Sequence, residues 1–209
     1  MKLNFMKEIA VDWKMELPAK RQISEMWKTM TFQMLDGNFK FIDLLKKYLR
    51  SGYIYFKGFV PSDNAVFDFF SSRGRLGEID FFNKFLLSET VLASFPTDDC
   101  LCDDYKIEPI EKSPDFKMMN SFAVDAEFAS LLCCGGAYGS TFRETAKKAK
   151  ALAQEFCRDL FDEEYESIYF YKSEKAWNSW FIDYLIDDTY IIISLKKRTI
   201  WILAFTDVD

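Results

Sequence analysis

The sequence predicts an α+β fold in which helices pack on a C-terminal antiparallel β-meander. Apolar residues recur at helical spacing over much of the first 162 residues, and from Tyr165 onward the apolar period changes to two. The chain has 209 residues, 49% of them hydrophobic, which is enough apolar material for one core. No repeat or linker divides it. We therefore expect a single domain over 1–209, helical over 1–162 and with its antiparallel sheet over 165–209.

The predicted helices all lie before the meander, within residues 18–160. A strand is expected over 53–60, and the stretch 96–120 looks irregular. The most regular apolar stripe follows Thr141 and Glu144, which form a capping-box pattern. Apolar spacing predicts helices over residues 18–36, 38–52, 76–87, 122–134 and 141–160.

Four strands are expected in the meander, near residues 165–171, 177–186, 189–195 and 199–205. The last three are apolar on both faces, so they need cover from both sides. In an up-and-down order, the start of the first strand, the second turn and the end of the fourth strand lie at the same end. An acidic pole is therefore expected there, formed by Asp162, Glu163, Glu164, Glu166, Asp187, Asp188, Asp207 and Asp209. The other turns would form a basic pole of Lys172, Lys175, Lys196, Lys197 and Arg198, although turns are often charged simply because they are solvated.

Charge and composition restrict the partners and the compartment. The net charge is −6, with 11 Lys and Arg against 6 Asp and Glu in residues 1–60, and 16 against 27 in the remainder. An acidic surface repels phosphate backbones, so a basic protein is a better partner than a nucleic acid. The apolar runs are too short to cross a bilayer, and charge comes too early for a signal peptide. With five cysteines, an odd number, we expect reduced thiols and a cytoplasmic location, with no membrane contact.

The residues of common catalytic sites are missing. The chain has no histidine, which excludes the usual nucleophile triads and the histidine zinc helix. Cys100, Cys102, Cys133 and Cys134 lack the usual zinc spacing, and core thiols explain them better. The glycine-rich run 135–141 offers backbone amides to a phosphate but lacks the lysine of a phosphate-binding loop, and helix stop and start signals explain it better. We expect no catalytic residue, no metal and no cofactor.

Some polar and aromatic residues of the sheet have two interpretations. Asp183, between apolar neighbours, either faces a partner or satisfies a buried arginine or backbone amides. Clustered carboxylates at the acidic pole could hold magnesium for phosphodiester cleavage, but Ser194 stands where a nuclease pattern needs its second carboxylate. Trp177, Trp180 and Trp201 are expected in the core rather than at an interface.

The C-terminal segment resembles a known class of proteins. Three segments are similar to the end of small bacterial immunity proteins: the run Ala176-Trp177-Asn178-Ser179-Trp180-Phe181-Ile182-Asp183, the Asp187-Asp188-Thr189-Tyr190 turn, and the ending Trp201-Ile202-Leu203-Ala204-Phe205-Thr206-Asp207-Val208-Asp209. Those proteins belong to contact-dependent growth inhibition and related polymorphic toxin systems. The resemblance covers about the last 35 residues. It implies a cytosolic, non-catalytic protein that binds and blocks a cognate toxin, often a basic nuclease.

Together these observations favour a non-catalytic immunity protein that neutralises a basic, nuclease-type toxin. The partner-binding residues expected at the acidic pole are Glu163, Glu164, Glu166, Asp187 and Asp188. Two alternatives stay open. One is a carboxylate-metal-dependent phosphodiesterase, and the other is a structural subunit of a larger assembly, which would carry a wide apolar patch.

Overall fold

The protein forms an α+β fold around one antiparallel sheet, as the sequence predicts. The computed structural model describes residues 11–14, 17–49, 52–96, 107–110, 113–183 and 185–207. Six strands pair in the order β1-β2-β6-β5-β4-β3, and all neighbours are antiparallel. They are β1 (Phe32–Leu35), β2 (Gly52–Pro61), β3 (Lys117–Met119), β4 (Ile168–Ser173), β5 (Ile186–Ser194) and β6 (Thr199–Asp207).

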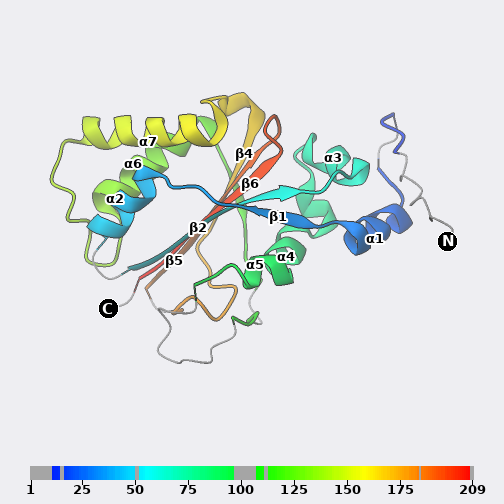
Figure 1. The fold of residues 1–209 in the computed structure, drawn as a ribbon, viewed down its shortest axis with the longest axis horizontal. Helices are drawn as coiled ribbons and strands as arrows, with labels where there is room; N and C mark the ends of the chain where they lie inside the picture. The colour runs from blue at the N-terminus through cyan, green and yellow to red at the C-terminus, as the bar shows by residue number, and fades with distance from the viewer. Residues whose placement is uncertain are drawn as a thin grey trace.

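Helices cover the sheet on both sides. In Figure 1, α2, α6 and α7 lie on one side of the strands, and α1, α3, α4 and α5 lie on the other. The helices are α1 (Lys20–Thr29), α2 (Lys40–Tyr48), α3 (Ala65–Ser71), α4 (Phe81–Leu86), α5 (Glu89–Leu92), α6 (Val124–Cys134) and α7 (Ala146–Phe161). Short 3-10 turns occur at η1 (Leu76–Ile79), η2 (Ser121–Ala123) and η3 (Tyr165–Ser167).

Two hydrophobic cores lie on the two faces of the sheet. Ile191 and Ile193 of β5 pack into the core on the α1, α3 and α4 side, whereas Tyr190 and Ile192 pack into the core under α2, α6 and α7. Burying a large apolar side chain contributes about 1.5–3 kcal/mol, so strands that are apolar on both faces stabilise both layers. The sequence prediction that these strands need cover on both sides is confirmed.

Three strands lie within the first 162 residues, which the sequence predicts to be helical apart from one strand, so β1 and β3 are additions to the prediction. The predicted strand at 53–60 is present as β2, which pairs with β6 from Gly52↔Asp207 to Phe59↔Ile200. The predicted helix over 18–36 ends at Thr29, and β1 follows because Phe32 to Leu35 pair with β2 and the Phe32 ring packs 4.7 Å from that of Phe85. β3 lies inside the stretch 96–120, of which residues 97–106 and 111–112 fall outside the described residues.

The second strand of the meander, predicted over 177–186, is not formed: residues 177–183 and 185 are not strand, and Ile186 is the first residue of β5. Trp177, Trp180 and Phe181 recur at intervals of three and one, and all enter the same core, which an alternating strand could not achieve. The Trp177 indole Nε1 donates to Thr189 Oγ1 at 2.9 Å, which holds this segment on the sheet. β4 therefore pairs directly with β5, from Ile168↔Ser194 to Ser173↔Thr189. The meander has three strands instead of four.

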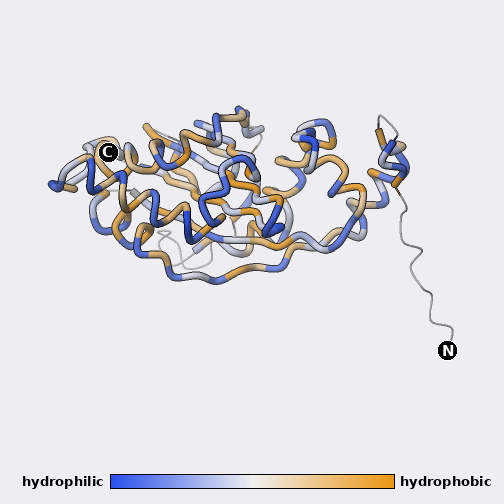
Figure 2. Tube along the Cα trace, turned by 90° about the horizontal axis from the view of Figure 1, so that it is seen from above, coloured by the Kyte–Doolittle hydropathy of each residue, from blue (hydrophilic) through white to orange (hydrophobic). Residues whose placement is uncertain are grey.

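The long helix begins later than its capping-box pattern predicts. Thr145, rather than Thr141, caps α7 by accepting from the Lys148 amide at 3.2 Å. The Thr141 amide instead donates to Tyr48 O at 2.9 Å and ties the glycine-rich run to α2. Figure 2 shows that the helices carry hydrophobic and hydrophilic residues together. Among the described residues, no helix combines the length and the apolar character that a membrane span requires.

Candidate functional site

The structure does not bring the expected acidic residues to one end of the sheet. With β4 paired directly to β5, the start of β4 lies beside the β5–β6 turn, because Ile168 opposes Ser194 and Ser194 opposes Thr199. Glu163, Glu164 and Glu166 therefore lie beside the basic residues Lys196, Lys197 and Arg198. Asp187 and Asp188 lie at the opposite end, as does Asp207, which is 1% exposed; Asp209 falls outside the described residues. The expectation of separate acidic and basic poles is wrong.

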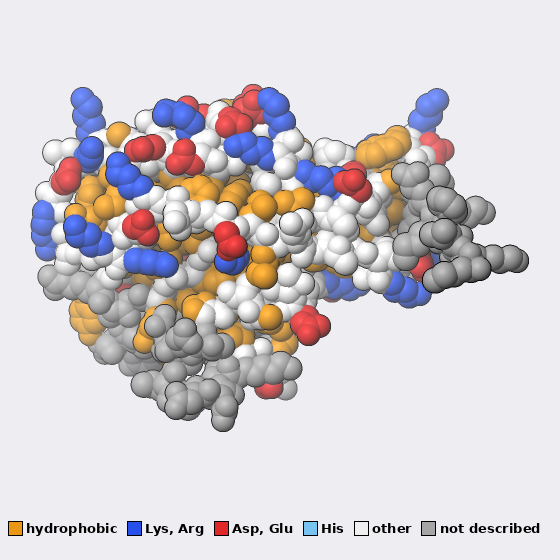
Figure 3. Space-filling view, viewed as in Figure 1, with side chains coloured by type: hydrophobic (Ala, Val, Ile, Leu, Met, Phe, Trp, Pro, Cys, Tyr) orange, Lys and Arg blue, Asp and Glu red, His pale blue; other side chains and the backbone are white. Residues whose placement is uncertain are grey.

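Residues 162–167 form a compact acidic turn between α7 and β4, and we call this segment the acidic turn. Its carboxylates are held by basic side chains: Arg158 Nε lies 3.2 Å from Glu163 Oε2, and Lys197 Nζ lies 3.0 Å from Asp162 Oδ1. Lys196 also pairs with Glu164. Acidic and basic side chains are intermixed along the upper rim of the molecule in Figure 3. Solvent screens such exposed pairs, so they fix side-chain positions more than they stabilise the fold.

Glu166 differs from the other acidic residues of this turn. It is exposed and has no ion-pair partner among the residues that the structure describes. The turn therefore presents one carboxylate whose charge is not directly neutralised, next to three that are paired.

The backbone of the acidic turn is strained. Asp162 and Glu163 both have φ 59°, in the left-handed region that residues with a Cβ rarely adopt. Such residues cost on the order of 1 kcal/mol each, and they cluster at sites where a fixed geometry is needed. Two of them in succession turn the chain from the end of α7 into η3, which brings Glu164 and Tyr165 beside η2.

Glycine at position 162 should relieve part of this strain. We expect Asp162→Gly to unfold with a free energy about 1 kcal/mol higher than that of Asp162→Ala, because alanine keeps the steric penalty at positive φ. Both variants lose the same contact with Lys197, so their difference isolates the backbone term. Urea denaturation of the two proteins measures it. Equal stabilities would show that residue 162 does not adopt the left-handed conformation in solution.

An exposed aromatic side chain stands beside the acidic turn. Phe122 in η2 is 67% exposed, and its ring stacks on that of Tyr165 with 6.0 Å between centroids. Tyr165 in turn packs edge-on against Phe161, 5.3 Å away. Asn120 accepts from the Phe122 amide at 3.0 Å and so fixes the start of η2. The Phe122 ring is therefore held on a rigid support and has most of its surface in solvent.

Asp187 and Asp188, at the other end of the sheet, are enclosed by the protein. Asp187 is 9% exposed and accepts from Thr206 Oγ1 at 2.7 Å. Asp188 lies 3.2 Å from Lys172 Nζ, and the Tyr190 hydroxyl donates to it at 3.2 Å. Burial raises the pKa of both carboxyl groups, although these contacts oppose the effect. Neither carboxylate is placed to make a broad surface contact.

The raised pKa of Asp187 has a testable effect on stability. The folded protein binds the proton of this carboxyl group more tightly than the unfolded chain does. As the pH rises from 3.8, the ordinary pKa, through the raised pKa of the folded state, the group therefore lowers the free energy of unfolding. We expect Asp187→Asn to be more stable than the parent at pH 7, with a difference that shrinks as pH falls towards about 4. Asparagine keeps an oxygen to accept from Thr206.

Urea unfolding at both pH values measures this difference, with Asp43→Asn on the exposed side of α2 as the control. A variant at position 187 that is less stable than the parent at pH 7 would contradict the account of Asp187.

The zinc and magnesium alternatives, which the sequence does not favour, have no geometric support among the described residues. No group of three or more Cys, Asp or Glu side chains is placed to hold a metal ion among these residues. Cys133, Cys134 and Cys157 are free thiols, whereas Cys100 and Cys102 lie outside the described residues. Burial raises the pKa of Cys157 to about 12, which keeps this thiol protonated and unreactive.

Comparison with known proteins adds no relative. No family model matches the chain, and no curated protein or solved structure is similar to it. The candidate site therefore rests on the geometry of the acidic turn and Phe122.

Phe122 is the residue that the sequence expectations missed, although a signal for it exists. The predicted helix over 122–134 places Val124, Phe128 and Leu131 on one face, and all three are buried. Position 122 lies two residues before Val124, about 200° around a helix, and so points away from that face. An aromatic residue outside the apolar stripe is a candidate for a surface contact.

Proposed function

We propose that this protein is a non-catalytic immunity protein that neutralises a basic, nuclease-type bacterial toxin by binding it in the cytoplasm. The observation that carries the proposal is the exposed Phe122 ring beside the strained acidic turn. We infer that the toxin docks on this surface, with Phe122 entering an apolar depression and the carboxylates facing basic side chains.

The geometry around Phe122 fits a protein partner better than a small ligand. Aromatic residues dominate the binding energy of many interfaces when they insert into a pocket and a polar rim excludes water around them. Phe122 is already supported by Tyr165, so little side-chain freedom is lost on binding. The neighbouring strand β3 is an edge strand of the sheet as far as the structure describes the chain, and Met118 on it is 54% exposed. Apolar contact can therefore extend along this edge.

The charges of the acidic turn would orient a basic partner and raise its association rate. Arg158, Lys196 and Lys197 hold three carboxylates in place, while Glu166 remains available to a basic partner. Carboxylates in an overall acidic protein, with net charge −6, attract a basic toxin and speed its association. A nuclease must itself be basic where it binds its phosphate substrate, so an acidic inhibitor matches the surface that it needs to cover.

The resemblance of residues 176–209 to immunity proteins supports the same function by a separate argument. Several residues that carry it are structural in this chain: Trp177 and Thr206 are fully buried, and Trp201 is 7% exposed. The resemblance therefore concerns the sheet and its packing. The proposed contact residues Phe122 and Glu166 lie outside it.

A growth assay tests the proposal. An immunity gene is expected directly downstream of its toxin gene, so the toxin domain encoded upstream is expressed in a sensitive bacterium with and without this chain. We expect co-expression to restore growth, and the purified chain to inhibit the toxin's nuclease activity at a one-to-one ratio. If growth is not restored, or if no toxin gene lies upstream, the proposed function is wrong.

A further inference from the structure

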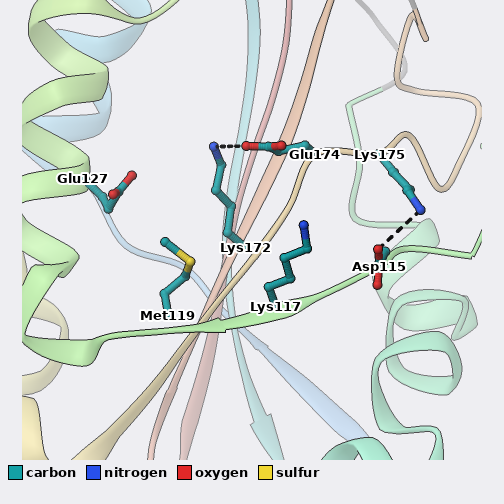
Figure 4. A pocket seen from close by; sticks show the side chains of 7 residues that line it. All are labelled: Asp115, Lys117, Met119, Glu127, Lys172, Glu174 and Lys175. Atoms are coloured by element: carbon teal, nitrogen blue, oxygen red, sulfur yellow. Dashed lines mark hydrogen bonds and ion pairs between the residues drawn. The ribbon is translucent and has the colours of Figure 1, made fainter.

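A pocket of about 400 Å³ lies at the end of β3 and β4 opposite the acidic turn. Figure 4 shows its walls: Glu127 comes from α6, Lys117 and Met119 from β3, and Lys172 from β4. The loops on either side contribute Asp115, Glu174 and Lys175. Lys117 opposes Lys172, and Met119 opposes Phe170 in the strand register, so these side chains share the α6 face of the sheet.

The lining itself carries three carboxylates and three ammonium groups, and Asp188, which lies outside the lining and pairs with Lys172, adds one more negative charge. Lys172 is shared by two carboxylates, with its Nζ 2.9 Å from Glu174 Oε1 and 3.2 Å from Asp188 Oδ2. Lys175 pairs with Asp115 at 3.5 Å. Neither Glu127 nor Lys117 has an ion-pair partner among the described residues.

Glu127 is the carboxylate of this lining that is placed to bind a cation. It is half-buried on α6, and its carboxylate points towards the pocket in Figure 4. The Met119 side chain lies between Glu127 and Lys117 and provides an apolar surface. A carboxylate next to an apolar surface suits a cation at the end of an aliphatic chain, because the stem is buried on methionine while the head is neutralised.

We propose that this pocket receives one basic side chain of the partner, with its cationic head at Glu127 and its aliphatic stem on Met119. This inference rests on the proposed function, since it assigns the pocket to the same basic toxin. β4 has six residues, so about 17–20 Å separates the pocket from the acidic turn. A standard interface of about 800 Å² per partner is roughly 30 Å across and can cover both.

Titration with amino-acid probes tests the pocket without the toxin. N-acetyl-L-arginine methylamide supplies the cationic side chain, N-acetyl-L-glutamate methylamide supplies its anionic counterpart, and the ¹³C-methyl NMR signal of Met119 reports binding. We expect saturable shifts with a millimolar dissociation constant for the arginine probe only. The Glu127→Gln change should weaken this binding by about two- to fivefold, whereas Lys117→Gln should tighten it by about twofold, because it removes a repelling charge. The signal of Met26, which is fully buried in the core, shows whether each variant keeps its fold.

The two variants should change the affinity for the arginine probe in opposite directions. This distinguishes cation binding at the pocket from a merely structural role of these two residues. Glu144→Gln, an exposed change outside the pocket, should leave the titration unchanged. Binding of the glutamate probe, weaker arginine binding by Lys117→Gln, or no saturation up to about 50 mM would overturn the proposal. Its failure is distinguishable from that of the proposed function. If the toxin is neutralised but the arginine probe does not bind, only the pocket assignment is lost. If the probe binds but the toxin is not neutralised, the proposed function fails, and the pocket keeps its preference for a cationic side chain but loses the toxin as its occupant.

Discussion

Replacing Trp177 with alanine is expected to lower the free energy of unfolding by about 3–5 kcal/mol. Trp177 is fully buried, and its ring packs 5.4 Å from that of Phe95 and 5.5 Å from that of Phe181. Its indole nitrogen also donates to the buried Thr189 hydroxyl. The alanine variant would leave a cavity and an unpaired hydroxyl at the contact that fixes residues 174–183 on the sheet. Since domains of this size are stable by about 5–15 kcal/mol, this loss is a large share of the total.

Urea denaturation followed by circular dichroism measures this loss. Trp177→Phe keeps most of the volume and should lose less. Trp13→Ala is a matched control, because Trp13 is 50% exposed, and it should cost about 1 kcal/mol or less. If the two alanine variants lose the same stability, residue 177 is not in the core, and the three-strand meander loses its support.

Replacing Phe122 with alanine is expected to weaken toxin binding by at least about 30-fold, the effect of losing an interface hot spot. The loss should appear mainly in a faster dissociation rate, because a buried aromatic slows release. The stability of the free protein should change by about 0.5–1 kcal/mol at most, since the ring is 67% exposed and contacts chiefly Tyr165. Surface plasmon resonance with the toxin domain, together with urea denaturation, separates the two effects.

Two further variants control this measurement. Tyr138→Ala removes another exposed aromatic, 61% exposed, near the opposite end of the sheet, and should leave the affinity unchanged. Glu166→Lys should slow association at low salt and have little effect at high salt, where the charge is screened. Equal losses from Phe122→Ala and Tyr138→Ala would place the toxin elsewhere.

The parts of the fold that were predicted correctly are those whose signal is local. α7, β5 and β6 follow from periodic apolar residues within the element itself, and the need for cover on both faces of β5 follows from Ile191 and Tyr190 facing opposite ways. The predictions fail where contacts between residues far apart in the sequence determine the local structure. β1 forms because β2 lies beside it, and the Trp177 segment becomes a loop because its core and its hydrogen-bond partner belong to other elements.

The candidate site was predicted in part. Glu163, Glu164 and Glu166 were selected from sequence as contact residues, and they form one turn because they are adjacent in the chain. Their expected association with Asp187 and Asp188 depended on the number of strands, and converting one strand to a loop moved those two residues to the opposite end. A position at the end of a sheet is therefore less predictable than a position within a turn.

Hydrogen–deuterium exchange of the complex with the toxin domain is the most direct test of where this protein acts. Exchange should slow on binding at residues 120–123 and 162–167, and at the adjoining strand β3, while the amides around Tyr138 stay unchanged. Slower exchange confined to other surfaces, or no difference between the free and mixed proteins, would contradict the assignment of the acidic turn and Phe122 as the toxin-binding surface.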